Sequence, residues 1–188
     1  MNEHLRTLYL GLSLIYKDIH SVCAKCTDNQ CEGYVWLLKE EATSLYDLDV
    51  PIVEINDNTF FIHSFEEVDG ALSINKPKPP CRLRRNGLCL MYDSRPLVCR
   101  MYPVGLETVD GEILLVFHKG CKFSRDMNGD RKAVFIAKVV ELMKQTSPDL
   151  LCEIMTSYQA VDAISAFPEG SNVFEVIMPL RSLIQERR

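Results

Sequence analysis

The segment that most constrains this chain runs from Cys81 to Pro103 and places three cysteines among arginines and turn residues. Cys89 and Cys99 follow Cys81, and Asn86-Gly87 and Ser94-Arg95-Pro96 mark the turns between them. Cysteines that act as core hydrophobes more often lie in apolar runs. Cationic neighbours favour the thiolate, which is the form that binds metal, so we interpret this segment as half of a metal or iron–sulfur site.

A second group of cysteines lies upstream, where Cys23 and Cys26 form a C-x2-C pair and Cys31 follows. Such a pair can bring two sulfurs around one metal ion, and the polar residues between Cys26 and Cys31 indicate a loop. Three sulfurs cannot complete a four-ligand site. The spacing therefore predicts that this group and the group ending at Cys121 converge in space.

Length and composition are those of an ordinary globular protein, and we expect one domain over residues 1–188. The chain has 188 residues, of which 47% are hydrophobic and 25% charged. A net charge of -5 argues against a general nucleic-acid binder. No apolar run approaches the roughly 18 residues that span a bilayer, so we expect no membrane association. Without a signal-peptide cleavage pattern we expect the cytoplasm, where disulfides are rare and grouped cysteines favour metal.

Hydrophobic periodicity and turn signals predict an α+β fold. Short β-hairpins and metal-binding cysteine loops make up the front half, with a cysteine-cluster region at 20–125 and a helical C-terminal part at 126–188. The pattern predicts helices at 3–20, 39–48, 134–146 and 148–164, and a weaker helix at 173–186 that kinks or starts at Pro179. It predicts hairpins at 52–62 and at 104–118 around Asp110-Gly111, and a turn-rich segment at 64–80.

The sequence from Arg95 to Pro103, R-P-L-V-C-R-M-Y-P, resembles the YkgJ-like cysteine-cluster proteins, described as a zinc- or iron-chelating domain. The upstream C-x7-C and the downstream Gly120-Cys121 extend the resemblance over about residues 20–125, where the chain is also similar to flagellin lysine-N-methylase. The first cysteine group has one thiol fewer than that family's pattern, which ends in adjacent cysteines. The resemblance implies these metal ligands: Cys23, Cys26, Cys31, Cys81, Cys89, Cys99 and Cys121.

Two arginines beside Cys99 are candidates for holding the bound group. Arg95 and Arg100 can bind an anion or donate hydrogen bonds to thiolates, and pairing with a carboxylate such as Asp93 is an equal alternative. His20 and His118 lie near cysteines and can complete a zinc site, but a structural role is favoured for both.

Other residues of this region have simpler expected roles. We expect Tyr92 and Tyr102 to cover the site. We expect Cys152, which lies among Leu150, Leu151 and Ile154, to be packed in the core.

Cysteine-only ligation suits zinc and an iron–sulfur cluster equally, and the wide spacing of the second group slightly favours the cluster. The chain contains no phosphate-binding, dinucleotide-binding or hydrolase motif. The sequence therefore predicts a metal-binding cysteine-cluster protein that serves redox chemistry or modification of a protein partner. The alternative is a structural-zinc domain that acts as an interaction module without catalysis. The sequence does not decide between an enzyme and a binding protein, or predict the oligomeric state.

Overall fold

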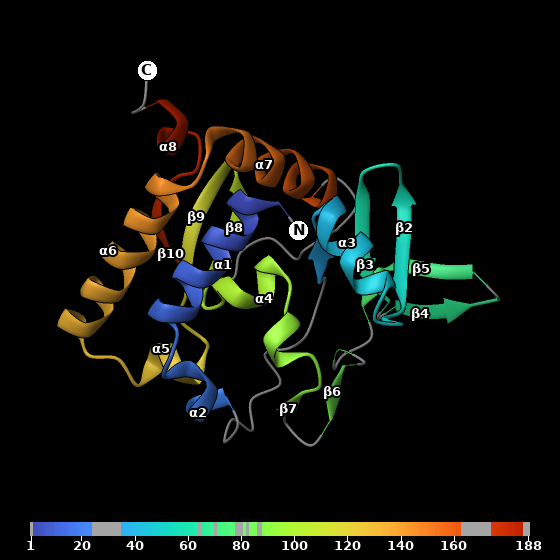
Figure 1. Ribbon diagram of the computed structural model, residues 1–188, viewed down its shortest axis with the longest axis horizontal. Coiled ribbons are helices and arrows are strands. Elements are labelled where there is room, and N and C mark those ends of the chain that lie inside the picture. The colour runs from blue at the N-terminus through green and yellow to red at the C-terminus, as the bar shows by residue number, and fades with distance from the viewer. Residues whose placement is uncertain are drawn as a thin grey trace.

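The structure is a computed structural model that describes residues 2–23, 35–63, 65–69, 71–77, 81, 83–85, 88–162 and 174–185 (Figure 1). Helices surround small antiparallel sheets, which confirms the α+β prediction. Among these residues, none of the helices is long and apolar enough to cross a membrane. The helices are α1 (Glu3–Ile15), α2 (Ile19–Cys23), α3 (Lys39–Tyr46), η1 (Tyr92–Ser94), α4 (Leu97–Met101), α5 (Lys122–Arg125), α6 (Gly129–Gln145), α7 (Pro148–Asp162) and α8 (Ser182–Gln185). The strands are β1 (Trp36–Leu37), β2 (Ile52–Asn56), β3 (Thr59–Ile62), β4 (Phe65–Val68), β5 (Ala71–Pro77), β6 (Arg84–Arg85), β7 (Leu88–Cys89), β8 (Val104–Val109), β9 (Glu112–His118) and β10 (Phe174–Pro179).

The main core lies between the sheet β10-β9-β8 and the helices α1, α6 and α7. Leu5, Leu8 and Leu12 recur at helical spacing on α1 and are all buried, as the sequence pattern predicts. The predicted helix at 3–20 is interrupted, because α1 ends at Ile15 and a turn precedes α2. At this turn the hydroxyl of Tyr16 donates to the carbonyl of Met101 at the end of α4. The chain therefore bends where a long-range hydrogen bond fixes it.

The second sheet, β1-β3-β2, separates the main core from a smaller one. Alternate residues of a strand point to opposite faces, so Phe61 lies in the main core while Phe60 and Ile62 lie in the smaller core. Ala42 and Leu45 of α3 close the smaller core. The predicted hairpin at 52–62 is confirmed in this sheet.

The hairpin between β8 and β9 turns at the predicted Asp110-Gly111 pair. Asp110 has φ 52° and Gly111 has φ 77°, and two successive positive φ values are typical of a type I′ turn. Glycine adopts such a φ without the strain that a Cβ imposes. The register, with Val104 opposite Phe117, sets the ends of both strands.

Two sequence predictions for irregular or helical segments are wrong. The helix predicted at 173–186 is wrong for residues 174–179, which form β10 and pair antiparallel with β9, with Phe174 opposite His118. After Pro179 the chain does become helical, in α8. Their bulky apolar side chains favour a strand once an open edge of β9 is available, and Pro179 stands at the strand end, where a missing N–H is tolerated. The turn-rich segment at 64–80 contains the hairpin of β4 and β5, in which Phe65 pairs with Pro77.

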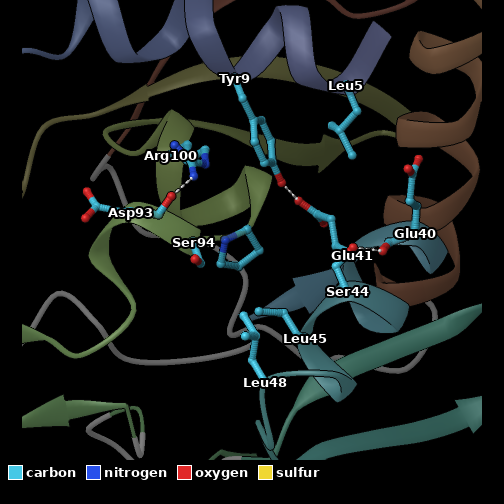
Figure 2. Close-up of a pocket in the computed structure, with 11 residues that line it drawn as sticks. Leu5, Tyr9, Glu40, Glu41, Ser44, Leu45, Leu48, Asp93, Ser94 and Arg100 are labelled. Carbon is cyan, nitrogen blue, oxygen red and sulfur yellow. Dashed lines mark hydrogen bonds between the residues drawn. The ribbon is translucent and has the colours of Figure 1, made fainter. Parts of the chain in front are cut away.

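Three helices meet at the buried carboxylate of Glu41, which is 5% exposed (Figure 2). Its Oε2 accepts the backbone N–H of Leu38 at 2.8 Å, and its Oε1 accepts the backbone N–H of Leu97 at 2.6 Å. The hydroxyl of Tyr9, on α1, donates to the same Oε1. Glu41 thus joins α1, the start of α3 and the start of α4, with donors to both oxygens.

We expect the stability of the protein to depend on pH through Glu41. Burial raises the pKa of Glu41 from 4.5 to about 6, against the lowering effect of the hydrogen bonds from Tyr9, Leu38 and Leu97. The folded protein then binds this proton more tightly than the unfolded chain does, so protonation of Glu41 stabilises the folded state. This stabilisation is complete below pH 4.5 and is lost as the pH rises through about 6. The free energy of unfolding of the wild type, relative to that of Glu41→Gln, should therefore fall by about 2 kcal/mol between about pH 4 and pH 7.

Urea unfolding of both proteins across this range measures the difference. Glu54→Gln, which removes an exposed carboxylate from β2, is the control for loss of a charge. A difference that stays constant or increases with pH contradicts the effect attributed to burial.

Candidate metal centre

Apart from Cys152 on α7, the cysteines of the described residues lie on or next to short elements. Cys23 is the last residue of α2, and Cys89 ends β7. Cys99 lies in α4, and Cys121 is the N-cap of α5. Cys81 precedes β6 and accepts the N–H of Arg84 at 2.8 Å through its carbonyl. In Figure 1, α2, α5 and β7 lie in the lower part of the view, and α4 lies above them near the centre.

Cys81 and Cys89 lie within electrostatic range of each other at the β6–β7 hairpin. Burial raises the pKa of the Cys89 thiol, and the neighbouring Cys81 raises it further. The backbone N–H of Met91 and the guanidinium of Arg95 act in the opposite direction and lower it. Burial outweighs the other effects, so the thiol favours its protonated form, and Arg95 and the N–H of Met91 are the groups that act to stabilise a thiolate here.

The side chains of Arg95 and Arg100 donate hydrogen bonds to the backbone of the turn that leads to Cys99. The Nε of Arg95 donates to the carbonyl of Tyr92 at 3.0 Å, and the guanidinium lies 3.7 Å from the centroid of the Tyr92 ring. The Nε of Arg100 donates to the carbonyl of Arg95 at 2.6 Å, and its Nη2 donates to the carbonyl of Asp93 (Figure 2). Both arginines are half-buried. They contact backbone carbonyls, including that of Asp93, rather than the Asp93 carboxylate.

Arg95 affects the pKa values of both Cys89 and Tyr16, and Cys121 also affects that of Tyr16. Burial raises the pKa of Tyr16, the thiol of Cys121 adds to this effect, and the charge of Arg95 opposes it. Since Arg95 also lowers the pKa of Cys89, its guanidinium lies within electrostatic range of Tyr16 and Cys89. The charge of Arg95 therefore acts on residues from two segments far apart in the sequence.

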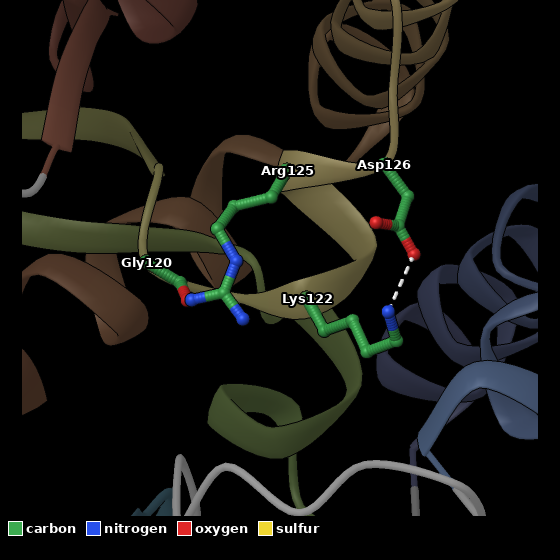
Figure 3. A network of polar contacts seen from close by, with 4 residues as sticks. All are labelled: Gly120, Lys122, Arg125 and Asp126. Atoms are coloured by element: carbon green, nitrogen blue, oxygen red, sulfur yellow. Dashed lines mark hydrogen bonds and ion pairs between the residues drawn. The ribbon is translucent and has the colours of Figure 1, made fainter.

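The turn that carries Cys121 is fixed by its own short helix (Figure 3). Arg125 donates from Nη1 to the carbonyl of Gly120 at 2.9 Å, and Lys122 pairs with Asp126 at 3.1 Å. Cys121 is buried, and α5 packs against α2, at whose end Cys23 lies. Of the first cysteine group, the described part ends at Cys23, on the helix that packs against the one following Cys121.

A buried hydroxyl on α5 forms no hydrogen bond within the described part of the chain. Ser124 is 7% exposed, and in the described part of the chain its Oγ has no hydrogen-bond partner. It lies three residues after Cys121, one helical turn away. A buried hydroxyl without a partner costs free energy, and sulfur ligands of a metal centre accept hydrogen bonds. The donor therefore fits an anionic sulfur centre beside α5.

The remaining candidate ligands lie outside the described residues. These are Cys26, Cys31 and the side chains of Cys23 and His20. Among the side chains that are described, no three of the types His, Cys, Asp and Glu are grouped closely enough to hold a metal ion. The cysteines that are described, Cys81, Cys89, Cys99, Cys121 and Cys152, are not in disulfides.

His118 is held by its own packing. Its ring stacks on Tyr102 at 5.5 Å between centroids and meets Phe174 edge-on at 6.3 Å. Nε2 lies 3.6 Å from Oε1 of Glu107, and a Cβ at Gly105 would lie 2.8 Å from the same nitrogen. Burial lowers the pKa of His118. These contacts hold the ring of His118, at the end of β9, in a fixed position beside β8.

The prediction that Cys152 is packed in the core is wrong. The helical repeat directs Leu150, Leu151 and Ile154 of α7 inward, and Cys152 is exposed on the opposite side. Its apolar neighbours in sequence are therefore not its neighbours in space. Cys152 is therefore an exposed thiol on α7 and is not one of the candidate metal ligands.

Sequence analysis did not identify Glu41, Tyr9, Tyr16 or Ser124 as part of this region. The acidic first turn of the helix at 39–48 is the only sequence signal for Glu41. Tyr9 and Tyr16 lie at helical spacing among apolar residues, which is typical of ordinary core positions.

Comparison of the chain with protein-family models, with curated proteins and with solved structures finds no match.

We expect Arg100→Lys to lower the free energy of unfolding by about 1–2 kcal/mol, because an ammonium cannot reach the carbonyls of Asp93 and Arg95 together. Arg131→Lys on the exposed side of α6 is the matched control and should change stability by less than about 0.5 kcal/mol. Chemical unfolding of the three proteins measures both values. Equal stability of Arg100→Lys and the control contradicts the role of the guanidinium in holding this turn.

Proposed function

We propose that this chain is a metal-binding cysteine-cluster protein of the YkgJ-like type, which holds an iron–sulfur cluster or zinc through its two groups of cysteines. The observation that carries the proposal is the packing of α2, which ends at Cys23, against α5, whose N-cap is Cys121. The ligands proposed are Cys23, Cys26, Cys31, Cys81, Cys89, Cys99 and Cys121.

The surroundings of the described cysteines support this proposal. Arg95 lies within range of Cys89, and the unpartnered hydroxyl of Ser124 lies one turn from Cys121. A centre with several thiolates carries excess negative charge, which nearby cations and hydrogen-bond donors stabilise. Arg95 and Arg100 are proposed to supply this stabilisation. An iron–sulfur cluster would supply one-electron transfer to a protein partner, whereas zinc would fix the cysteine loops.

The interaction-module alternative has one observation in its favour. Leu10 and Leu14 of α1 are 60% and 77% exposed, and Val134 of α6 is 56% exposed. The last two line an open groove between α1 and α6. Exposed apolar side chains that cluster in this way are typical of a surface that binds a partner. In this second proposal zinc has a structural role, and the groove is the functional surface.

Anaerobic purification with metal analysis and a visible spectrum tests the proposal. An iron–sulfur protein is brown with sulfur-to-iron charge-transfer bands, and a zinc protein is colourless. Protein that contains neither metal, even after reconstitution with iron and sulfide or with zinc, contradicts it.

We expect Cys99→Ser to lower the metal content and to destabilise the elements around α4, because the free energy of metal binding is partly free energy of folding. Cys152→Ser is the matched control, since Cys152 is exposed on α7 and away from the proposed ligands. Its metal content should equal that of the wild type. Equal metal-to-protein ratios in wild type and Cys99→Ser contradict the assignment of Cys99 as a ligand.

A further inference from the structure

The helix that carries Cys99 has no cap of its own. The N-cap of α4 is Pro96, which makes no side-chain hydrogen bond to the helix, and the first N–H groups of a helix lack intrahelical partners. Glu41 supplies the missing acceptor by bonding the N–H of Leu97 at 2.6 Å from 56 residues away in the sequence. A carboxylate at this end of a helix also interacts favourably with the helix dipole.

The other side of Cys99 is tied to the same carboxylate through Tyr9. The hydroxyl of Tyr9 donates to Glu41, and the guanidinium of Arg100 lies 4.2 Å from the centroid of the Tyr9 ring. Leu97 and Arg100 are therefore both fixed by one group of contacts, and Cys99 lies between them in the sequence. Cys99 also lies within electrostatic range of Tyr9.

Apolar packing does not hold α4 on this side. A cavity of about 190 Å³ lies between α1, α3 and the start of α4, and Tyr9, Glu41, Pro96 and Arg100 contribute to its lining (Figure 2). Where side chains leave such a space, few dispersion contacts resist movement of the helix. Leu97 anchors this turn in the main core on its other side, and on the side of the cavity the polar contacts of Glu41 and Arg100 restrain it.

Glu41 is not explained by stability alone. Moving a carboxylate out of water is costly, and a well-packed apolar residue in place of a buried charge is often neutral or stabilising. An apolar residue cannot accept hydrogen bonds from Leu38, Leu97 and Tyr9, so it cannot fix their relative positions. The carboxylate therefore fixes the relative positions of α1, the start of α3 and the start of α4.

We infer that Glu41 is a positioning residue, which fixes the first turn of α4 so that the thiol of Cys99 is presented to the proposed metal centre. This inference rests on the proposed function. It assigns to Glu41 no contact with the metal or with its ligands. Its effect passes through the backbone of Leu97 and through Tyr9 and Arg100.

Glu41→Gln tests the inference because the amide keeps the size of the side chain but replaces one acceptor by a donor. All three partners of Glu41 are donors, so the NH2 group of Gln must face at least one N–H or O–H. Metal-loaded protein is mixed with excess chelator, and the loss of metal is followed by the cluster absorption or by the bands of Co²⁺ exchanged for zinc. We expect the variant to lose metal about 10- to 100-fold faster than the wild type and to show shifted absorption bands.

The control is Leu151→Ala, which removes a buried side chain from α7, a helix that packs on β1 and β3. It destabilises the main core without changing the contacts of Glu41, so its absorption bands and rate of metal loss should match those of the wild type well below the melting temperature. Tyr9→Phe is a second variant that folds with the ring retained beneath Arg100. It should show a smaller increase in rate than Glu41→Gln.

The outcomes separate this inference from the proposed function. If the wild type holds metal and both Glu41→Gln and Tyr9→Phe match it in rate and spectrum, the inference is overturned and the proposed function stands. If Leu151→Ala accelerates metal loss as much as Glu41→Gln does, the effect is general destabilisation and the inference is also overturned. If Glu41→Gln does not fold, the result for Tyr9→Phe decides. A wild type without metal overturns the proposed function and this inference with it.

Discussion

One buried carboxylate sets the relative positions of three segments that are far apart in the sequence. Glu41 accepts hydrogen bonds from α1, from the residue before α3 and from the start of α4. A carboxylate out of water is stable only when donors replace its hydration, so the arrangement requires all three segments to be in place together. The position of each one therefore depends on the other two.

The segment most affected is α4, because it is too short to determine its own geometry. Its five residues follow a proline without a side-chain cap, and the Tyr102–Pro103 bond that follows them is cis. Contacts from outside fix both ends, with Glu41 at Leu97 and Tyr16 at Met101. Short helices are marginal in water, so tertiary contacts must supply the stability that α4 lacks. The turn that bears Cys99 is consequently a product of the whole fold rather than of its local sequence.

Local chemistry made part of this structure predictable. Asp110-Gly111 adopts the turn that its positive φ values require, and the apolar spacing of α1 and α7 gives their buried faces. On α6 the buried side chains are Phe135, Val139 and Met143, whereas Val134, on the face that the apolar spacing predicts, is exposed. The strand β10 was missed because its partner edge on β9 belongs to a distant part of the chain. Cys152 was misplaced because apolar neighbours in sequence say little about which face of a helix a residue occupies.

The candidate site divides in the same way between local and distant information. The sequence identifies Arg95 and Arg100 as neighbours of Cys99, since all three lie on one short turn. Their hydrogen bonds to backbone carbonyls depend on how that turn folds, and no residue pattern specifies them. For Glu41 the sequence indicates only an acid in the first turn of a helix, where the helix dipole favours it. Its bond to Leu97 spans 56 residues, a separation over which no local pattern carries information.

The choice of acceptors for the two arginines has an electrostatic consequence. A guanidinium paired with a carboxylate loses most of its outward charge, whereas one bonded to neutral carbonyls keeps it. The hydrogen bonds that Arg95 and Arg100 donate to the carbonyls of Tyr92, Asp93 and Arg95 bring no negative charge to the turn. The charge of Arg95 accordingly lowers the pKa of Cys89, although burial and Cys81 raise it more. Burial favours the protonated form of a thiol. A metal ion adds a positive charge to that of the arginine, and the thiol then loses its proton more readily. Arg95 therefore favours the anionic form of the Cys89 sulfur, while the hydrogen bonds of both arginines hold the turn in shape.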